Sequence, residues 1–550
     1  MLYTENFIKI YEQALKDNYE LPALSDYGTD VSFTNKELAV EIEKIHFLFE
    51  EYNIRKGDKI ALVGKNSAYW GAVFMATITY GAVIVPILND FNPKDIQHII
   101  NHSDALLLFA SDSNLNELEE DQMPALKMIY SFTGKQITNK KEGDNLMVRL
   151  TNLFDKKYPT GFNKEMISYK EIPNENLMVL NYTSGTTGFS KGVLITGDNL
   201  TGNIIYAQNT IPLNRGENLL SLLPLAHAYG CSFEFLFPLS EGCHVTLLGK
   251  TPSPKILMKA FEVVKPDLII SVPLVLEKIY KNTIVPTINK PIMKILLKIP
   301  GVNSVIYSKI NKKLVSAFGG NFKQVVIGGA PLNSEVEQFF LKIKFPVSVG
   351  YGMTECAPLV SFAPDNEYVP LSAGKVLPSM EVRIDSPDPY NVAGEIQIKG
   401  QNVMLGYYKN DEATDQVFTE DGWLKTGDLG TIDKANNIFI RGRSKSMILS
   451  SSGQNIYPEE IEAKLNNLPY IVESLVISNN NRLIALVYPD YDAAKAAGVS
   501  EEDLKNIMRK NKEAVNSIVA GYEKIAEIKL RENEFEKTPK KSIKRYLYTD

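Results

Sequence analysis

Short apolar runs that alternate with helix-like stretches limit the fold of this chain more than any other feature. Residues 60–63 (Ile-Ala-Leu-Val) and 82–85 (Ala-Val-Ile-Val) are two such runs, with a helical stretch between them. Alternation of this kind is typical of parallel sheets covered by helices. Four further runs suit buried strands that end in loops of special composition: 178–182, 268–271, 324–327 and 346–349. We therefore expect an α/β fold whose ligands bind beyond the carboxyl ends of the strands.

The carboxyl-terminal part of the chain has a different pattern. After Asp428 it changes to short alternating strands and turns, and the Pro-Glu-Glu-Ile-Glu sequence at 458–462 suits the first turn of a helix. Further apolar runs predict strands of a small α+β unit. Because 550 residues are too many for one compact core, we expect a large domain over residues 1–443 and a small one over 444–550.

Charge and cysteine content exclude several classes of protein. The net charge is −6, so nucleic acid, which rewards clustered cations, is not an expected partner. Three cysteines (Cys231, Cys243 and Cys356) lack the paired spacing of zinc sites and disulfide frameworks. The sequence shows no secretory pattern at its amino terminus and no run of the roughly 20 apolar residues that a spanning helix needs. We expect a cytoplasmic protein.

The segment from Tyr182 to Gly192 is rich in glycine and hydroxyl residues and lies between two apolar runs. It reads Tyr-Thr-Ser-Gly-Thr-Thr-Gly-Phe-Ser-Lys-Gly. Glycines let successive backbone N–H groups converge, the hydroxyls add donors, and Lys191 adds positive charge, so the loop suits a polyphosphate. It does not match the Walker pattern, which disfavours the ordinary P-loop NTPases.

This loop resembles the signature of the adenylate-forming superfamily, which contains acyl-CoA synthetases, firefly luciferase and peptide-synthetase adenylation domains. Four more segments resemble the family's segments in the same order: 350–355, 426–428, 441–445 and 452–462. Residues 272–280 and the stretch that follows to Phe318 are similar to bacterial long-chain fatty acid–CoA ligases, although Leu274 stands where those usually have arginine. The resemblance covers the chain from Thr183 onward.

The resemblance implies that ATP activates a carboxylic acid to acyl-AMP, with release of pyrophosphate, and that the acyl group then passes to coenzyme A. It implies a nucleotide site made by Thr183, Ser184, Gly185, Thr186, Thr187, Gly188, Lys191, Gly329, Ala330, Gly350, Tyr351, Gly352, Thr354, Asp428 and Arg443. In that site Tyr351 stacks on adenine, and Asp428 accepts from the ribose hydroxyls. Lys191, Thr354 and Glu355 are implied to be catalytic, and Mg²⁺ is implied to bind at Glu355 and Thr186.

The resemblance also implies an acyl site, a thiol entry and a hinge. His227 and Gly352 border the acyl group, Gly453 and Gln454 line the thiol tunnel, and the small domain rotates about Lys445. Taken alone, His227 suits a structural histidine at least as well. His98 and His102 lie four residues apart, but a metal pair on a helix would need a third ligand.

One departure concerns the lysine that reaches the α-phosphate in this family. By the spacing typical of fatty-acid ligases, Ser542 stands at its position, with Lys541 directly before it. We hypothesise that Lys541 replaces the missing lysine; the alternative is that the basic run at 537–545 is a solvated tail.

The sequence leaves the acid, the acceptor and membrane contact open. The expected partners are a fatty acid, ATP and coenzyme A, but a ligase for acyl carrier protein, a ligase for a shorter or aromatic acid and a non-catalytic acyl or nucleotide sensor remain alternatives. Three lysines spaced four apart alternate with apolar residues between Lys290 and Ile299. That pattern suits either a helix packed on the core or peripheral contact at the inner membrane face. Nothing in the sequence indicates an oligomeric state.

Overall fold

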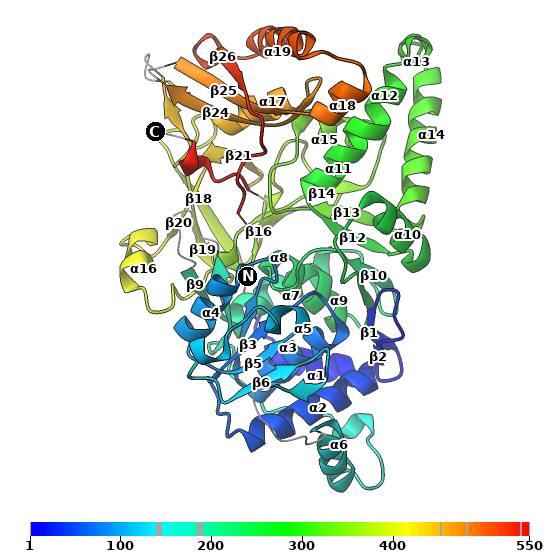
Figure 1. The fold of residues 1–550 in the computed structure, drawn as a ribbon, viewed down its shortest axis with the longest axis vertical. Helices are drawn as coiled ribbons and strands as arrows, with labels where there is room; N and C mark the ends of the chain where they lie inside the picture. Colours follow the sequence, from blue (N-terminus) through cyan, green and yellow to red (C-terminus); the bar gives the residue numbers. More distant parts are fainter. Residues whose placement is uncertain are drawn as a thin grey trace.

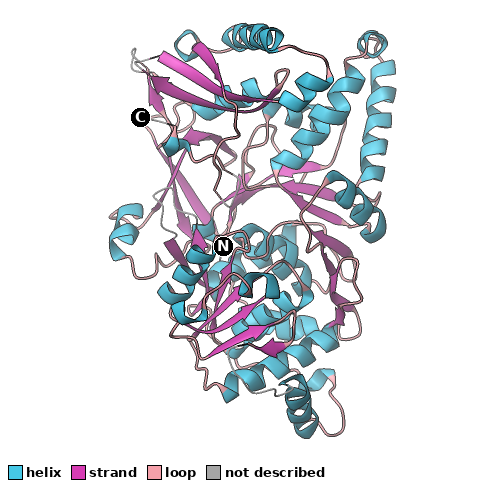
Figure 2. Ribbon diagram, viewed as in Figure 1, coloured by secondary structure: helices cyan, strands magenta, loops and turns pink. Residues whose placement is uncertain are grey.

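The computed structural model describes residues 2–138, 146–183, 191–450, 454–479, 482–538 and 542–548. Two seven-stranded sheets form the centre of the large part of the molecule (Figure 2). The order in the first is β7-β6-β5-β3-β4-β8-β9, with parallel neighbours inside and antiparallel strands β7 and β9 at its edges. Its strands are β7 (Gln136–Ile137), β6 (Met128–Ser131), β5 (Ala105–Ala110), β3 (Lys59–Val63), β4 (Val83–Ile87), β8 (Leu177–Thr183) and β9 (Lys191–Thr196).

The second sheet has the order β14-β13-β12-β10-β11-β1-β2 and is parallel except at its β2 edge. Its strands are β14 (Val347–Val349), β13 (Gln324–Ile327), β12 (Leu268–Ser271), β10 (Asn218–Ser221), β11 (His244–Leu247), β1 (Pro22–Asp26) and β2 (Ser32–Thr34). Because neighbouring parallel strands end at one edge, the loops after β12, β13 and β14 lie close together.

Helix α3 (Ala68–Tyr80) joins the two sheets into one core. It is apolar on all sides, which requires burial on all sides, and it packs against β3 and β4 of the first sheet and β1 of the second. A Cβ on Gly71 would lie 2.7 Å from the Leu24 side chain, so this face of the helix touches the second sheet closely. One hydrophobic cluster therefore runs through both sheets.

The remaining α-helices of the large part lie around the sheets, and some of them project away from the two large sheets (Figure 1). They are α1 (Phe7–Asp17), α2 (Asn35–Glu51), α4 (Pro93–His102), α5 (Asp112–Leu115), α6 (Leu146–Lys157), α7 (Gly197–Thr210), α8 (Ala228–Gly230), α9 (Phe237–Ser240), α10 (Pro254–Val264), α11 (Pro273–Ile279), α12 (Val285–Ile288), α13 (Pro291–Leu296), α14 (Val302–Ala317), α15 (Ser334–Lys342) and α16 (Asp411–Val417). A second hydrophobic cluster lies under α10, α11, α14 and α15. None of the helices in these described stretches is both long and apolar enough to cross a bilayer.

Two smaller antiparallel sheets lead from the second large sheet towards the carboxyl-terminal part. The first contains β15 (Tyr351–Gly352), β16 (Leu359–Phe362) and β17 (Lys375–Val376). The other contains β18 (Met380–Asp385), β19 (Gly394–Gly400), β20 (Leu424–Ile432) and β21 (Ile438–Arg443).

The carboxyl-terminal part is a small α+β domain with its own hydrophobic core, as the sequence predicts. It contains β22 (Ile448–Leu449), β23 (Asn455–Ile456), α17 (Pro458–Asn466), β24 (Ile471–Asn479), β25 (Arg482–Pro489), α18 (Tyr491–Ala496), α19 (Glu501–Asn516) and β26 (Ile525–Leu530). The boundary between residues 443 and 444 stays a prediction.

The small domain contacts the large one at the carboxyl end of α17. Asn333 Nδ2 donates to the carbonyl of Ala463 at 2.9 Å, and Asn467 Nδ2 donates to Asn333 Oδ1 at 3.0 Å. The Lys281 ammonium donates to the carbonyls of Asn466 and Ile471. A cation beside the last carbonyls of a helix is favoured by the helix dipole.

The expected strands are present, with small shifts at their ends. The runs at 268–271 and 324–327 are β12 and β13, whereas the run at 82–85 becomes β4 and continues through Pro86 to Ile87. The basic and apolar stretch at 290–299 is helical only over α13, because the residue before a proline is driven out of the helical region and Pro300 and Gly301 follow.

Candidate functional site

The ends of the phosphate-loop candidate are held by an antiparallel strand pair. Thr183, the last residue of β8, pairs with Lys191, the first residue of β9. At the base of the loop Tyr182 is buried, and its hydroxyl lies 2.7 Å from His102 Nδ1. Five predicted nucleotide-binding residues lie outside the described residues: Ser184, Gly185, Thr186, Thr187 and Gly188.

Lys191 and Glu355 lie on either side of Tyr407. The Lys191 Nζ is 4.8 Å from the centre of the Tyr407 ring, and the Tyr407 hydroxyl donates to Glu355 Oε1 at 2.9 Å. Burial and the nearby Glu355 carboxylate raise the pKa of Tyr407 well above its usual range, so the hydroxyl stays a donor. The structure thus brings together two predicted catalytic residues and a tyrosine that sequence reasoning missed.

The backbone around Glu355 is fixed by close contacts. The short 3₁₀ turn Thr354–Cys356 connects β15 to β16, and the Met404 N–H donates to the Glu355 carbonyl at 2.8 Å. Thr354 is buried. A Cβ on Gly352 would lie 2.2 Å from the Pro358 carbonyl oxygen, so this position accepts only glycine.

The predicted glycines after β13 and β14 meet at one edge of the second sheet. The Gly350 N–H donates to the Ile327 carbonyl at 2.9 Å, which places Gly350 beside the loop that holds Gly329 and Ala330. Gly329 has a φ of 83°, a left-handed conformation that favours glycine. Both Gly329 and Ala330 are exposed, so their backbone is open to a ligand.

Tyr351, Asp428 and Arg443 form the part of the site predicted to bind the nucleoside. The Tyr351 hydroxyl donates to Asp428 Oδ2 at 2.7 Å, and Arg443 Nε lies 3.4 Å from Asp428 Oδ1. Asp428 and Arg443 are register partners on β20 and β21. Burial raises the pKa of Asp428, while Arg443 and the Tyr351 hydrogen bond oppose that rise.

His227 is the N-cap of α8 and lies near the same sheet edge. Its Nδ1 accepts from the Tyr229 N–H at 3.3 Å, so the ring has a structural role as the cap of this helix. Tyr229 in turn packs against Gly328, where a Cβ would lie 2.9 Å from the Tyr229 ring. The acyl role predicted for His227 stays a prediction.

A buried carboxylate shapes the loop that leads to His227. Glu234 is fully buried and accepts hydrogen bonds from the N–H groups of Leu222 and Leu223 and from the Ser221 hydroxyl. Burial raises the pKa of Glu234 to about 8. No motif pointed to this residue, because the contact joins a strand end to the π-helical turn Cys231–Leu236.

The residues predicted for the thiol entry and the hinge lie at the start of the small domain. Gln454 is exposed and exchanges hydrogen bonds with Ser450, whereas Gly453 lies outside the described residues. Lys445 is exposed in a turn whose following N–H groups donate to the Arg443 carbonyl. Rotation about this turn stays a prediction.

Lys541 also lies outside the described residues, which end at Thr538 and resume at Ser542. Lys537 and Ile543 form a bridge, and the Thr538 N–H donates to the Ser542 carbonyl at 2.8 Å. Arg545 Nη1 contacts both Glu462 carboxylate oxygens, at 2.8 and 2.9 Å, and Nη2 donates to the Val476 carbonyl. The carboxyl-terminal segment is therefore anchored in the small domain.

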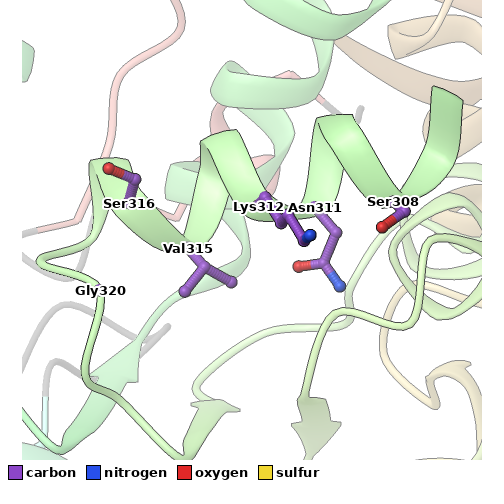
Figure 3. A pocket seen from close by; sticks show the side chains of 6 residues that line it. All are labelled: Ser308, Asn311, Lys312, Val315, Ser316 and Gly320. Carbon is purple, nitrogen blue, oxygen red and sulfur yellow. The ribbon is translucent and has the colours of Figure 1, made fainter. Parts of the chain in front are cut away.

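Two other features do not belong to this site. His98 and His102 have ring centres 5.7 Å apart, and the described residues contain no group of three side chains that could hold a metal ion there or elsewhere. An open hollow of about 430 Å³ lies along α14 and contains no predicted site residue; Figure 3 shows the side chains that line it. It is lined by Ser308, Asn311, Lys312, Val315, Ser316 and Gly320.

Comparison with known proteins covers nearly the whole chain. A model of the AMP-binding enzyme family matches residues 11–408, and one of the AMP-binding enzyme C-terminal domain matches residues 445–549. The long-chain-fatty-acid–CoA ligase FadD15 of Mycobacterium bovis is 29% identical over 510 residues, which is 86% of this chain and 81% of that protein. The probable 4-coumarate–CoA ligase 1 of Dictyostelium discoideum is 27% identical over 82% of this chain and 79% of that protein.

Solved structures show the same fold. The anthranilate CoA ligase AuaEII, in complex with anthranoyl-AMP, matches with a TM-score of 0.79 at 19% identity, over 100% of this chain and 97% of that one.

Proposed function

This chain belongs to the AMP-binding enzyme family and is an adenylate-forming acyl-CoA ligase, and from that premise we propose that its acid is a long-chain fatty acid. The acid is joined to AMP with release of pyrophosphate, and the acyl group then passes to coenzyme A. The observation that supports the ATP-dependent first step is the meeting of Lys191, Tyr407 and Glu355 beside the paired ends of the phosphate loop.

The first step needs alignment and charge neutralisation more than it needs a base. The substrate carboxylate is already a nucleophile; it attacks the α-phosphorus of ATP, and the bond from that phosphorus to the pyrophosphate oxygen breaks. Lys191 supplies positive charge close to the developing pyrophosphate, and the backbone N–H groups of the loop add donors. In the second step a thiolate attacks the acyl carbon, and AMP leaves with the oxygen of the mixed anhydride.

Glu355 fits a magnesium ion that arrives with the nucleotide. Its carboxylate is partly exposed and supplies hard oxygen ligands, and one of these oxygens is already oriented by Tyr407. Mg²⁺ binds through one or two protein carboxylates together with substrate phosphates, so a single carboxylate such as Glu355 can serve it. When bound, the ion would neutralise phosphate charge.

The nucleoside half of ATP fits Tyr351, Asp428 and Arg443. Asp428 accepts from Tyr351 and lies beside Arg443, so its carboxylate is oriented before a ribose arrives. A carboxylate can accept from two hydroxyl groups at once. We assign the adenine to the Tyr351 ring and the ribose hydroxyls to Asp428.

The small domain supplies the remaining groups in our proposal. Lys541 contacts the α-phosphate during adenylation, and rotation about Lys445 then brings Gln454 and Gly453 to the thiol entry. The proposed domains are residues 1–443 and 444–550. Arg545, which follows Lys541 in the chain, is anchored on Glu462 within the small domain.

The long-chain acid is supported by similarity to fatty-acid ligases and not by a cavity. The long-chain-fatty-acid–CoA ligase of Escherichia coli is 26% identical over 92% of this chain. Because ligases for coumarate and anthranilate are also similar to this chain, an aromatic or shorter acid is the alternative substrate.

The test is AMP release from ATP over a panel of acids from acetate to oleate, with coenzyme A or acyl carrier protein as acceptor. We expect AMP with palmitate or oleate and coenzyme A, and a loss of about a hundredfold or more in Glu355→Gln. The matched control is Glu367→Gln, at an exposed glutamate of the same region. Formation of ADP in place of AMP, or no AMP with any acid, would refute the proposal, and the second outcome would favour a sensor.

A further inference from the structure

One stretch of the chain is strongly basic although the protein as a whole is acidic. Between residues 278 and 333 there are nine lysines and no Asp, Glu or Arg, in a chain whose net charge is −6. The lysines are Lys278, Lys281, Lys290, Lys294, Lys298, Lys309, Lys312, Lys313 and Lys323. A local field of one sign attracts a partner of the opposite sign.

The middle of this stretch also exposes large apolar side chains. Ile292 and Ile295 on α13 are 72% and 64% exposed, and no residue from Lys290 to Ile310 is buried. Ile299, Val302 and Val305 continue the exposed set into the first turns of α14. Single exposed apolar residues are ordinary, but a contiguous group marks an interaction surface.

The same stretch of chain exposes lysines as well as isoleucines. Lys290, Lys294 and Lys298 are exposed and alternate with the exposed isoleucines along the chain. In Figure 1, α13 lies at the outer end of the column formed with α12 and α14, at the edge of the molecule. Long lysine side chains can hold their ammonium groups at phosphate level while neighbouring apolar groups enter the acyl layer.

We propose that the surface made by Lys290, Lys294, Lys298, Ile292 and Ile295 docks on an anionic lipid bilayer. A second copy of the chain is a poor occupant, since it would bring two sets of these lysines together and like charges repel. A soluble acidic protein would match the positive charge, but it would not explain why five large apolar side chains are exposed along successive helical turns. A bilayer with anionic head groups satisfies both.

This proposal does not rest on the proposed function, because its test measures binding to lipid and not catalysis. The full-length protein is mixed with phosphatidylcholine vesicles that contain phosphatidylglycerol, and with pure phosphatidylcholine vesicles, and each mixture is floated on a density gradient. We expect flotation with the anionic vesicles at low salt and its decline as salt rises.

Two variants separate the contributions of charge and apolar contact. The triple variant Lys290→Gln, Lys294→Gln, Lys298→Gln should lose about a hundredfold in vesicle affinity, since each lysine near an anionic surface contributes roughly a fivefold factor. The double variant Ile292→Ser, Ile295→Ser should also float less, with its salt dependence retained. The control carries the same charge change at three exposed lysines elsewhere, Lys434→Gln, Lys505→Gln and Lys510→Gln, and should float like the wild type.

Three results would overturn the proposal. Wild-type protein that stays at the bottom of the gradient with anionic vesicles is one, and equal flotation of the triple variant and its control is another. The third result is protein binding in place of lipid binding: the protein associates with itself without lipid, or binds an acidic acyl carrier protein but no vesicles. If the triple variant abolishes that binding, the surface belongs to a protein partner.

Discussion

The contact between Arg545 and Glu462 gives the sharpest test of how the carboxyl-terminal segment is held. Arg545 donates from Nη1 to both carboxylate oxygens and from Nη2 to the Val476 carbonyl. Glu462 also accepts from the Val476 N–H at 2.6 Å. Arg545→Ala removes the cation and leaves a buried carboxylate, and breaking such a pair costs about 3–5 kcal/mol.

The pKa of Glu462 decides where in that range the cost falls. Burial raises the pKa to about 7, and Arg545 opposes the rise. Because this is above the usual value for glutamate, the folded domain binds more protons than the unfolded chain, and its stability falls as pH rises from about 4.5 to 7. Without Arg545 the pKa rises further, so the variant's deficit grows with pH above 7. We expect about 3 kcal/mol at pH 6, rising by up to about 1.4 kcal/mol at pH 8, which corresponds to one pH unit above the wild-type pKa.

Hydrogen exchange of the full-length protein measures this loss at β24, which contains Val476. A deficit of 3–5 kcal/mol corresponds to exchange faster by about a hundredfold to a few thousandfold, up to the limit set by global unfolding. Lys544→Ala is the control, since Lys544 lies 3.7 Å from the largely exposed Glu536 and surface pairs contribute little. Double replacement with Glu462→Leu and Arg545→Met should restore protection only in part, because the Val476 N–H and carbonyl both lose their side-chain partners. Unchanged exchange in Arg545→Ala would refute the reasoning.

Three further perturbations test the site. Tyr407→Phe keeps the ring beside Lys191 but removes the donor to Glu355, so kcat/KM for ATP in acid-dependent pyrophosphate exchange should fall about 10- to 100-fold. Tyr408→Phe, which loses a hydrogen bond to Asp104, should stay near wild type, and an equal loss in both would contradict a specific role. In the wild type, the raised pKa of Glu234 makes folding take up a proton between pH 5 and 8, so stability falls as pH rises. Glu234→Gln should reduce this fall by up to about 1.4 kcal/mol per pH unit. Thermal unfolding at several pH values measures the slope, and an unchanged slope would reject the prediction. Lys541→Ala should abolish acid-dependent pyrophosphate exchange while transfer from preformed acyl-AMP to coenzyme A survives, and unchanged exchange would end that assignment.

The sequence predicts the sheets and much of the site because strands and glycine-rich loops are local patterns. β12 and β13 follow from apolar runs, and Gly352 is needed because Pro358 approaches its backbone. Tyr407 could not be found in this way, since it reaches Glu355 across 52 residues of chain. The same holds for the pair Glu462 and Arg545, which are 83 residues apart.

Periodicity also could not decide the environment of α13. Alternating lysine and isoleucine predicts a two-sided segment but does not say what lies against either side. Only the folded chain shows that Ile292 and Ile295 stay exposed and that the helix stops after Leu296. Exposure is a property of tertiary packing, and short segments do not encode it.

The Tyr407 ring also works as a spacer between opposite charges. Among the described residues the structure records no ion pair between Lys191 and Glu355, although each contacts the same tyrosine. If Lys191 formed an ion pair with Glu355, that pair would have to break before the lysine could bind a phosphate. The free energy of breaking it would weaken nucleotide binding. An incoming triphosphate would then meet a lysine that forms no ion pair with Glu355 within the described part of the chain, and the Glu355 carboxylate would be available to a metal ion that the nucleotide brings.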